Sequence, residues 1–96
     1  MKNKIDATYQ VYQKASLLKV LSNPVRLCIV KELITRGESN VSTVQHCLET
    51  SQSTISQHLS RLRDMGIVHG DRRGAEVYYR VVSEDATVVV KTLFNI

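Results

Sequence analysis

The sequence predicts a mainly α-helical domain with a small β-hairpin close to its C-terminal end. Apolar residues recur at helical spacing as far as Gly66, which indicates a succession of amphipathic helices. Beyond Gly66 they alternate with other residues, as in a strand. Helix start signals at Asn23-Pro24, Ser51 and Ser83 divide the chain further. We therefore expect about five helices and a two-stranded hairpin in one domain, residues 1–96.

The length and charge of the chain limit its class. Its 96 residues are enough for one modest hydrophobic core but not for two. The formal net charge is +4 and the pI is near 9.3, which suits an anionic partner but also fits an ordinary basic protein. Cys28 and Cys47 come without a signal peptide or an apolar run of membrane length. We therefore expect a cytoplasmic protein without membrane contact.

Two helices are expected before residue 40. The first covers about residues 5–21, and its apolar side carries Val11, Ala15 and Leu18. Asn23 can cap the second helix with Pro24 at its first position, because proline lacks only an N–H that would have no partner there. This second helix is expected over residues 24–35, and Gly37 ends it.

A helix–turn–helix pattern follows between residues 41 and 65. Ser42 and Gln45 have the spacing of a capping box, in which two side chains at a helix start satisfy each other's backbone N–H groups. A short helix to about Leu48 is expected, followed by a break. Ser51 can then cap a longer helix over about residues 52–65, whose narrow apolar seam consists of Ile55, Leu59 and Leu62.

The opposite face of this longer helix has an unusual composition. An ordinary exposed helix face favours Glu, Lys, Ala and Arg, because Ser and Thr lower helix stability. Here no acidic residue occurs between Ser51 and Asp64, and a surface that approaches phosphates avoids carboxylates in this way. A solvated surface is the alternative. We predict a recognition helix for double-stranded DNA, whose polar face carries Gln52, Ser53, Thr54, Ser56, Gln57, Ser60 and Arg61.

A β-hairpin is expected directly after the recognition helix, over about residues 67–81. Ile67-Val68 begins the first strand, and the second carries the alternating residues Val77, Tyr79 and Val81. The expected turn is Asp71-Arg72-Arg73-Gly74, with two cations at its tip. Such a hairpin is the wing of a winged helix. Arg72 and Arg73 would contact backbone phosphates or a minor groove, unless they are only solvated turn residues.

The last expected helix covers about residues 84–95. Ser83 can cap it, and its apolar residues cover more of the circumference than one packed face requires. We therefore expect this helix and the first to be buried between two subunits, with packing inside one chain as the alternative. Dimerisation would place two recognition helices one DNA turn apart, as a palindromic site requires. The expected interface residues are Val11, Ala15, Leu18, Val89, Leu93 and Phe94.

Four runs of the sequence resemble the ArsR/SmtB family of small bacterial repressors. They are LSNPVRL from Leu21, SQSTISQHL from Ser51, LRDMGIV from Leu62 and VYYRV from Val77. The resemblance spans residues 15–94 and implies a homodimeric winged helix-turn-helix repressor. It also implies base contacts by Gln52, Ser53, Ser56 and Gln57, and a position at or near DNA for His58, Arg61, Arg72 and Arg73. Thr50 departs from the family, which has an apolar residue before the Ser.

The metal sites of the family are missing from this sequence. One site uses two cysteines at the start of the third helix, where this chain has Ser42 and Val44. The other uses acidic and His residues of the last helix, which contains no His. His46, His58 and His69 fall in three different elements. We therefore expect no bound metal and no metal sensing at these sites.

A thiol switch stays open as an alternative. Thiol-responsive family members pair a cysteine of the second helix with one in the last helix. Cys28 is in the second helix, where the first cysteine of that pair would be, and it falls on a polar flank of the helix. The last helix has no cysteine to pair with it. Cys28 is therefore either redox-active or a small packing residue, and Cys47 is expected in the core. The spacing alone does not show whether the two can meet.

Other functional classes fit less well. No nucleophile–base or paired-carboxylate grouping is visible, so we expect no enzyme, no cofactor and no small-molecule ligand. A winged helix can also bind protein or RNA, but such modules often lose the polar, acid-free face. The sequence favours a dimeric transcriptional repressor that binds palindromic promoter DNA at the bacterial nucleoid.

Overall fold

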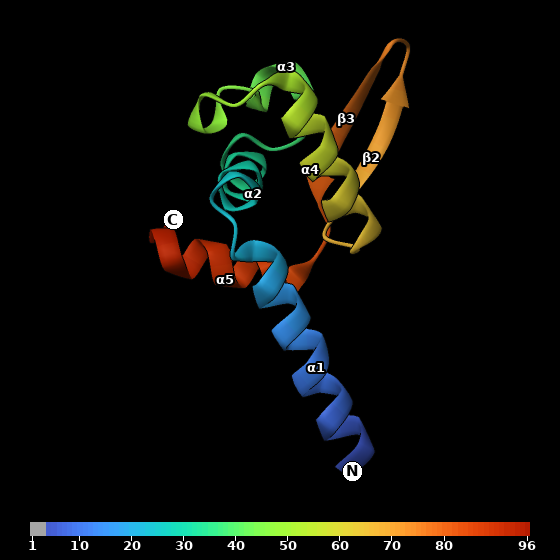
Figure 1. Cartoon of the computed structure of the whole chain (residues 1–96), viewed down its shortest axis with the longest axis vertical. Coiled ribbons are helices and arrows are strands. Elements are labelled where there is room, and N and C mark those ends of the chain that lie inside the picture. The colour runs from blue at the N-terminus through green and yellow to red at the C-terminus, as the bar shows by residue number, and fades with distance from the viewer. Residues whose placement is uncertain (1–3) are drawn as a thin grey trace.

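The computed structural model describes residues 4–96, so residues 1–3 of the predicted domain lie outside the described residues. It measures 46 × 29 × 20 Å, because the first helix extends well away from the other elements (Figure 1). In order, the elements are α1 (Lys4–Leu21), α2 (Pro24–Arg36), β1 (Ser39–Asn40), α3 (Val41–Val44), the 3₁₀ turn η1 (Cys47–Glu49), α4 (Gln52–Asp64), β2 (Val68–Arg73), β3 (Glu76–Val81) and α5 (Glu84–Phe94). The predicted combination of five helices and a hairpin is confirmed.

Three of the helix starts are those that the sequence predicts. The side-chain oxygen of Asn23 accepts a hydrogen bond of 3.0 Å from the backbone N–H of Arg26, and Pro24 opens α2. Ser51 accepts from the N–H of Thr54 at 3.2 Å, and Ser83 caps α5 in the same way. Each cap satisfies one backbone donor that has no partner within the helix.

The predicted capping box at Ser42 is wrong. The cap of α3 is Asn40, whose side-chain oxygen accepts from both the N–H and the hydroxyl of Thr43, at 3.0 and 2.9 Å. Ser42 therefore lies inside the first turn, and α3 ends at Val44 instead of reaching Leu48. An Asx cap two residues earlier competes with a Ser/Gln box, and the short loop after Gly37 favours the earlier start.

One hydrophobic core holds the helices and the sheet together. The predicted seam of α4 is confirmed, because Ile55, Leu59 and Leu62 are completely buried. They pack against buried residues of α2 and α5, of which Ile29, Val30, Ala86 and Val90 are also inaccessible to solvent. This packing fixes the polar face of α4 on the outside of the domain.

The wing spans almost the residues that the sequence predicts, but its first strand is longer and its turn comes later than expected. Strands β2 and β3 pair antiparallel from Val68–Val81 to Arg73–Glu76, and the turn consists of Gly74 and Ala75. Arg72 and Arg73 are therefore the last residues of β2, not the tip of the turn. Gly74 has φ 64°, a left-handed conformation that glycine adopts readily. The turn is therefore centred on Gly74 and Ala75, two residues later than predicted. The short strand β1 adds a third strand on the other side of β3.

Helix α1 is attached to the body mainly through its C-terminal end. Val20 and Leu21 are buried in the core, and Lys14 forms an ion pair with Asp85 at the start of α5. Nearer the N-terminus, Tyr9 and Tyr12 are 63% and 70% exposed. Within residues 4–96, no helix combines the length and apolar character needed to cross a bilayer.

Candidate nucleic-acid interface

The N-terminal half of α4 presents a continuous polar surface. Gln52, Ser53, Ser56 and Gln57 are all exposed, while the seam beneath them is buried. No carboxylate occurs on α4 before Asp64 in its last turn. The first N–H groups of the helix lie at the same end, where they favour an anion. Amide and hydroxyl groups on an anchored helix can read base edges in a major groove.

Two residues of the predicted DNA-contacting set, Thr54 and His58, lie at the border of this surface. Thr54 is half-buried, and its hydroxyl oxygen accepts a hydrogen bond of 2.9 Å from the Ser51 hydroxyl. His58 is also half-buried, and its pKa is lowered by this burial and, secondarily, by the positive charge of Arg26. The imidazole is therefore mainly neutral at pH 7. Both side chains lie on the flank of α4 that faces away from the wing.

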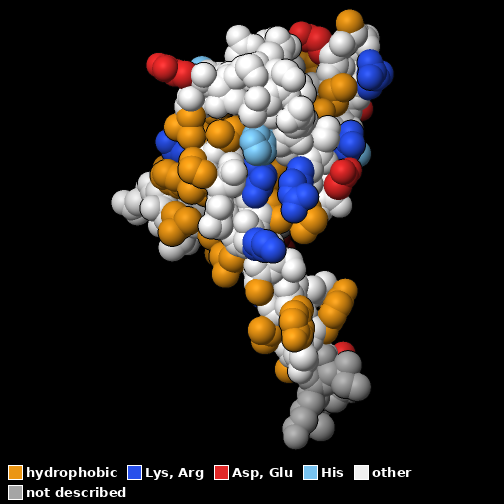
Figure 2. Space-filling view, in the orientation of Figure 1, with side chains coloured by type: hydrophobic (Ala, Val, Ile, Leu, Met, Phe, Trp, Pro, Cys, Tyr) orange, Lys and Arg blue, Asp and Glu red, His pale blue; other side chains and the backbone are white. Residues whose placement is uncertain are grey.

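A basic cluster borders the same flank. Lys19, Arg26 and Arg61 line one open cavity of about 500 Å³ between the end of α1 and the end of α4. Figure 2 shows Lys and Arg side chains gathered at the middle of this face, near the junction of α1 with the body. The Nε of Arg26 donates to the carbonyl of Val20 at 2.7 Å, which orients its guanidinium. Arg61 belongs to the predicted DNA-contacting set, whereas Lys19 and Arg26 do not, because only the folded chain brings α1, α2 and α4 together.

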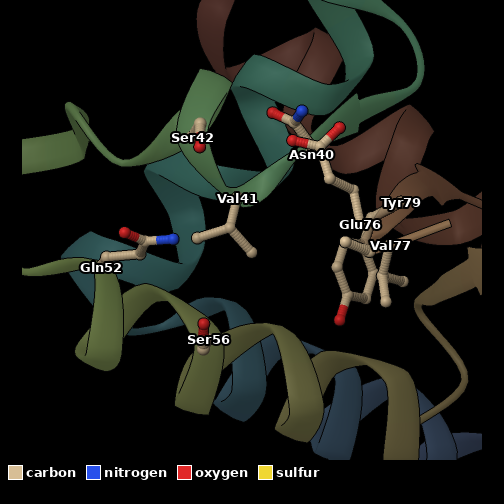
Figure 3. A pocket seen from close by; sticks show the side chains of 9 residues that line it. Asn40, Val41, Ser42, Gln52, Ser56, Glu76, Val77 and Tyr79 are labelled. Atoms are coloured by element: carbon tan, nitrogen blue, oxygen red, sulfur yellow. The ribbon is translucent and has the colours of Figure 1, made fainter. Parts of the chain in front are cut away.

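A polar cleft of about 230 Å³ lies on the wing side of α4 (Figure 3). Gln52 and Ser56 line it from the recognition helix, and Asn40 and Ser42 line it from the start of α3. Tyr79 and Glu76 of the wing complete the opposite wall. The recognition helix is thus flanked by a cleft on one side and a basic cluster on the other.

The two wing arginines differ in their surroundings. Arg73 forms ion pairs with Glu38, at 2.7 Å, and Asp71, at 3.1 Å, and its guanidinium lies 4.9 Å from the ring centre of Tyr78. Hydrogen bonds to Glu38 and Asp71 raise the pKa of the Arg73 guanidinium above its usual value. Arg72 is exposed and has no ion pair with any residue of the described range 4–96. Of the two, Arg72 is the better placed for a phosphate.

The two cysteines form a disulfide bond. Cys28 of α2 is bonded to Cys47 of η1, with their Cα atoms 5.8 Å apart. Cys47 is 1% exposed, which confirms its predicted place in the core. Cys28 is half-buried and packs on the core instead of standing on a polar flank. The expected polar position was wrong because η1 covers that side of α2, and η1 is not predictable from helical periodicity.

Among residues 4–96, no three His, Cys, Asp or Glu side chains are grouped as a metal ion would need. His46 lies 3.8 Å from Glu32, which also pairs with Arg36 at 2.7 Å. A hydrogen bond from Arg36 is the main cause of the lowered pKa of Glu32. This small network belongs to the surface of α2 and does not extend to α4.

Known proteins share this arrangement. Residues 23–69 match the family described as bacterial regulatory protein, arsR family. The Biofilm growth-associated repressor of Xylella fastidiosa is 36% identical over 91 residues, which make up 95% of this chain and 79% of that protein. The chain belongs to the arsR family. The resemblance noted in the sequence is thereby confirmed, and this ArsR-family protein is a DNA-binding transcriptional regulator.

Two further comparisons agree. The transcriptional repressor PagR of Bacillus anthracis is 37% identical over 79 residues, covering 82% of this chain and 79% of that repressor. The structure of reduced HlyU from Vibrio cholerae superimposes with a TM-score of 0.85 at 30% identity, covering 94% of each chain. The winged-helix fold is therefore common to the ArsR-family protein and its relatives.

Proposed function

We propose that this ArsR-family protein is a repressor that binds a palindromic promoter site as a homodimer. The exposed, acid-free polar face of α4 is the observation that carries the proposal. Relatives named as repressors support it. Gln52, Ser53, Ser56 and Gln57 would read bases, and Thr54 and His58 would lie at the edge of the contact.

Phosphate contacts would come from both flanks of α4. Arg61 and the neighbouring Lys19 and Arg26 form the basic cluster on one side. Arg72 extends from the wing on the other side, where Arg73 is held by Glu38 and Asp71. Phosphate contacts position a protein on the duplex, whereas base contacts select the sequence. This arrangement therefore surrounds a reading surface with positioning contacts.

The homodimer is supported by apolar side chains that one chain leaves in solvent. Val11 and Leu18 of α1 are 66% and 54% exposed, and Leu93 and Phe94 of α5 are 65% and 38% exposed. Ala15 is exposed as well, while Val89 is half-buried against the core of its own subunit. Figure 2 shows apolar side chains along α1, beyond the body of the molecule. Apolar patches of this kind mark interaction surfaces.

We also propose where the protein acts and what it lacks. Promoter binding places it in the bacterial cytoplasm, on nucleoid DNA. We propose no metal sensing at the usual family sites, because Ser42 and Val44 cannot supply thiolates and α5 contains no His or Cys. The family regulates transcription, and we propose neither catalysis nor a small-molecule ligand for this chain.

The test is a gel shift with the region upstream of the protein's own gene, followed by sequencing of the DNA fragments that the protein selects. We expect a salt-sensitive complex of one dimer on a palindromic sequence. Competitor DNA of random sequence should displace the protein poorly. Binding that is equally strong on random DNA, or a monomer in solution, would contradict the proposal and favour a protein- or RNA-interaction module.

A further inference from the structure

We propose that Cys28 and Cys47 form a thiol–disulfide switch that sets the position of the N-terminus of the recognition helix. The oxidant would be a low-molecular-weight disulfide. The disulfide-bonded protein would be the form that binds DNA tightly, and the dithiol form would bind less well. This inference rests on the proposed function, since it concerns how DNA binding is regulated.

The bond lies shortly before the recognition helix in the chain. Cys47 opens η1, and only Leu48, Glu49 and Thr50 separate this residue from Ser51, the cap of α4. Cys28 lies in the middle of α2, which is anchored in the core by Ile29 and its neighbours. The disulfide therefore ties the segment that enters the recognition helix to a helix that is anchored in the core.

The segment beyond Cys47 needs such a tie. Leu48 and Glu49 have φ values of 52° and 55°, in the left-handed region that side chains other than glycine rarely adopt. Leu48 is also 58% exposed, so little burial of its side chain offsets this strain. Two consecutive residues in this conformation persist only where the surrounding structure restrains them. Here the restraint on the N-terminal side is Cys47.

The location of the protein makes a permanent bond unexpected. Disulfides in a bacterial cytoplasm are reduced by cellular thiols, and those that do form there are usually transient and sensory. A protein that works on promoter DNA therefore alternates between dithiol and disulfide as the ratio of thiol to disulfide in the cell changes. The Cα separation of 5.8 Å falls in the usual range, so the bond can form without backbone displacement.

The reaction is thiol–disulfide exchange. Cys28 is the more accessible of the two, so its thiolate attacks one sulfur of the small disulfide RSSR and expels RS⁻. The thiolate of Cys47 then attacks Sγ of Cys28 in this mixed disulfide and expels the second RS⁻. The two thiol protons of the protein end on the released thiols. In sum, two protein thiols are oxidised by two electrons and RSSR is reduced to two RSH.

Reduction would act on the turn and not on α2. Two thiol groups require separate van der Waals space, so the two chain segments must move apart. Helix α2 is fixed by its core residues, whereas η1 is a three-residue turn that itself contains the strained residues Leu48 and Glu49. The turn would relax away from its left-handed conformation and carry Ser51 with it. Gln52 and Ser53 would then lose their fixed position, and base reading needs such preorganisation.

The first experiment counts thiols without any DNA. The purified protein is equilibrated with oxidised or reduced glutathione, alkylated with iodoacetamide and weighed by mass spectrometry. We expect two alkyl groups in the reduced protein and none after oxidation, and faster amide exchange at Leu48–Thr50 in the reduced form. A protein whose two thiols remain alkylatable after oxidation overturns the switch, whatever the protein binds.

The second experiment measures operator binding by fluorescence anisotropy in both redox states. We expect reduction to raise the Kd about fivefold or more, since allosteric coupling is commonly of that size. Cys28→Ser and Cys47→Ala should each bind like the reduced wild type and ignore the redox buffer. Equal or tighter binding by the reduced wild type overturns the proposal. If neither redox state binds specific DNA although the thiols are still oxidised and reduced reversibly, the proposed function is wrong while the disulfide itself is not in question.

Discussion

Arg73 of the wing forms an ion pair with Glu38, 2.7 Å from Nη1 to Oε1, across the gap between β2 and the segment after α2. The same guanidinium contacts Asp71 and the ring of Tyr78. A wing that is merely a mobile cationic arm would leave both arginines without ion-pair partners. Here Arg73, at the turn end of β2, is paired with the segment after α2, whereas its exposed neighbour Arg72 has no ion pair within residues 4–96.

This difference predicts unequal effects of two adjacent substitutions. Arg72→Ala should weaken binding to operator and random DNA alike, because a phosphate contact carries no sequence information. The slope of log Kd against log salt should become less steep by about one for each phosphate that the variant no longer neutralises. Arg73→Ala should change this slope less, since its charge is already compensated by Glu38 and Asp71. Anisotropy titrations at several salt concentrations measure both, and a larger slope change for Arg73→Ala would contradict the assignment.

Gln57 provides the corresponding test of base reading. Its side chain is exposed on the polar face of α4, one turn beyond Ser53. Gln57→Ala should cost about 1–3 kcal/mol against the operator, because a glutamine can form paired hydrogen bonds with one base. Binding to random DNA serves as the control and should be almost unchanged. An equal loss on both DNAs would show that Gln57 does not select sequence.

The sequence was a good guide to the helices because their signals are local. Asn23, Ser51 and Ser83 each start a helix through a hydrogen bond to a backbone N–H three residues away. The seam of α4 is likewise readable, since its spacing of three and four residues determines which side is buried. The polar face of α4 follows from the same spacing, and most of it is exposed, whereas its members Thr54 and Ser60 are half-buried.

Apart from the local errors at the start of α3 and at the hairpin turn, the features that the sequence did not reveal depend on contacts between distant segments. The bond from Cys28 to Cys47 requires η1 to fold over α2, and that turn contains Leu48 and Glu49 in a conformation no propensity predicts. The ion pair of Arg73 requires Glu38, which is 35 residues earlier in the chain. Such contacts are properties of the packed molecule, so residue spacing alone cannot supply them.

Dimerisation can be tested with two matched leucine substitutions. Leu93 on α5 and Leu48 in η1 have similar exposures, 65% and 58%. Leu93→Lys should shift the protein to a monomer, because a charge buried without a partner in an interface is strongly unfavourable. Leu48→Lys should leave the dimer intact. Light scattering coupled to size exclusion reports the mass of each variant, and a dimer in both cases would place the interface elsewhere.

The disulfide should also raise the free energy of unfolding. It closes a loop with a sequence separation of 19, and cross-linking a loop of this size stabilises a protein by about 3 kcal/mol, chiefly by restricting the unfolded chain. The oxidised wild type should therefore unfold at a higher urea concentration than the reduced wild type. Cys28→Ser should match the reduced protein in both redox buffers. Identical urea midpoints for the oxidised and reduced wild type would mean that the bond is absent in solution.

The lowered pKa of His58 predicts how the free energy of unfolding depends on pH. Burial, and after it the charge of Arg26, lowers the pKa of His58 below its usual 6.5, so the unfolded chain binds this proton more readily than the folded one. Well above pH 6.5 the imidazole is neutral in both states and the effect vanishes. As the pH falls below 6.5, the unfolded state gains the proton first and the free energy of unfolding decreases.

Thermal unfolding between pH 7.5 and 5 measures this effect. Glu32, whose pKa is lowered mainly by a hydrogen bond from Arg36, is present in wild type and variant alike, so comparing the two profiles isolates the contribution of His58. His58→Gln keeps a polar side chain without the proton, so its Tm should fall less on acidification than that of the wild type. His69→Gln, which replaces an exposed histidine of the wing, is the control for removing a histidine elsewhere in the chain. An unchanged profile in His58→Gln would mean that the imidazole does not experience the buried, cationic surroundings of Arg26.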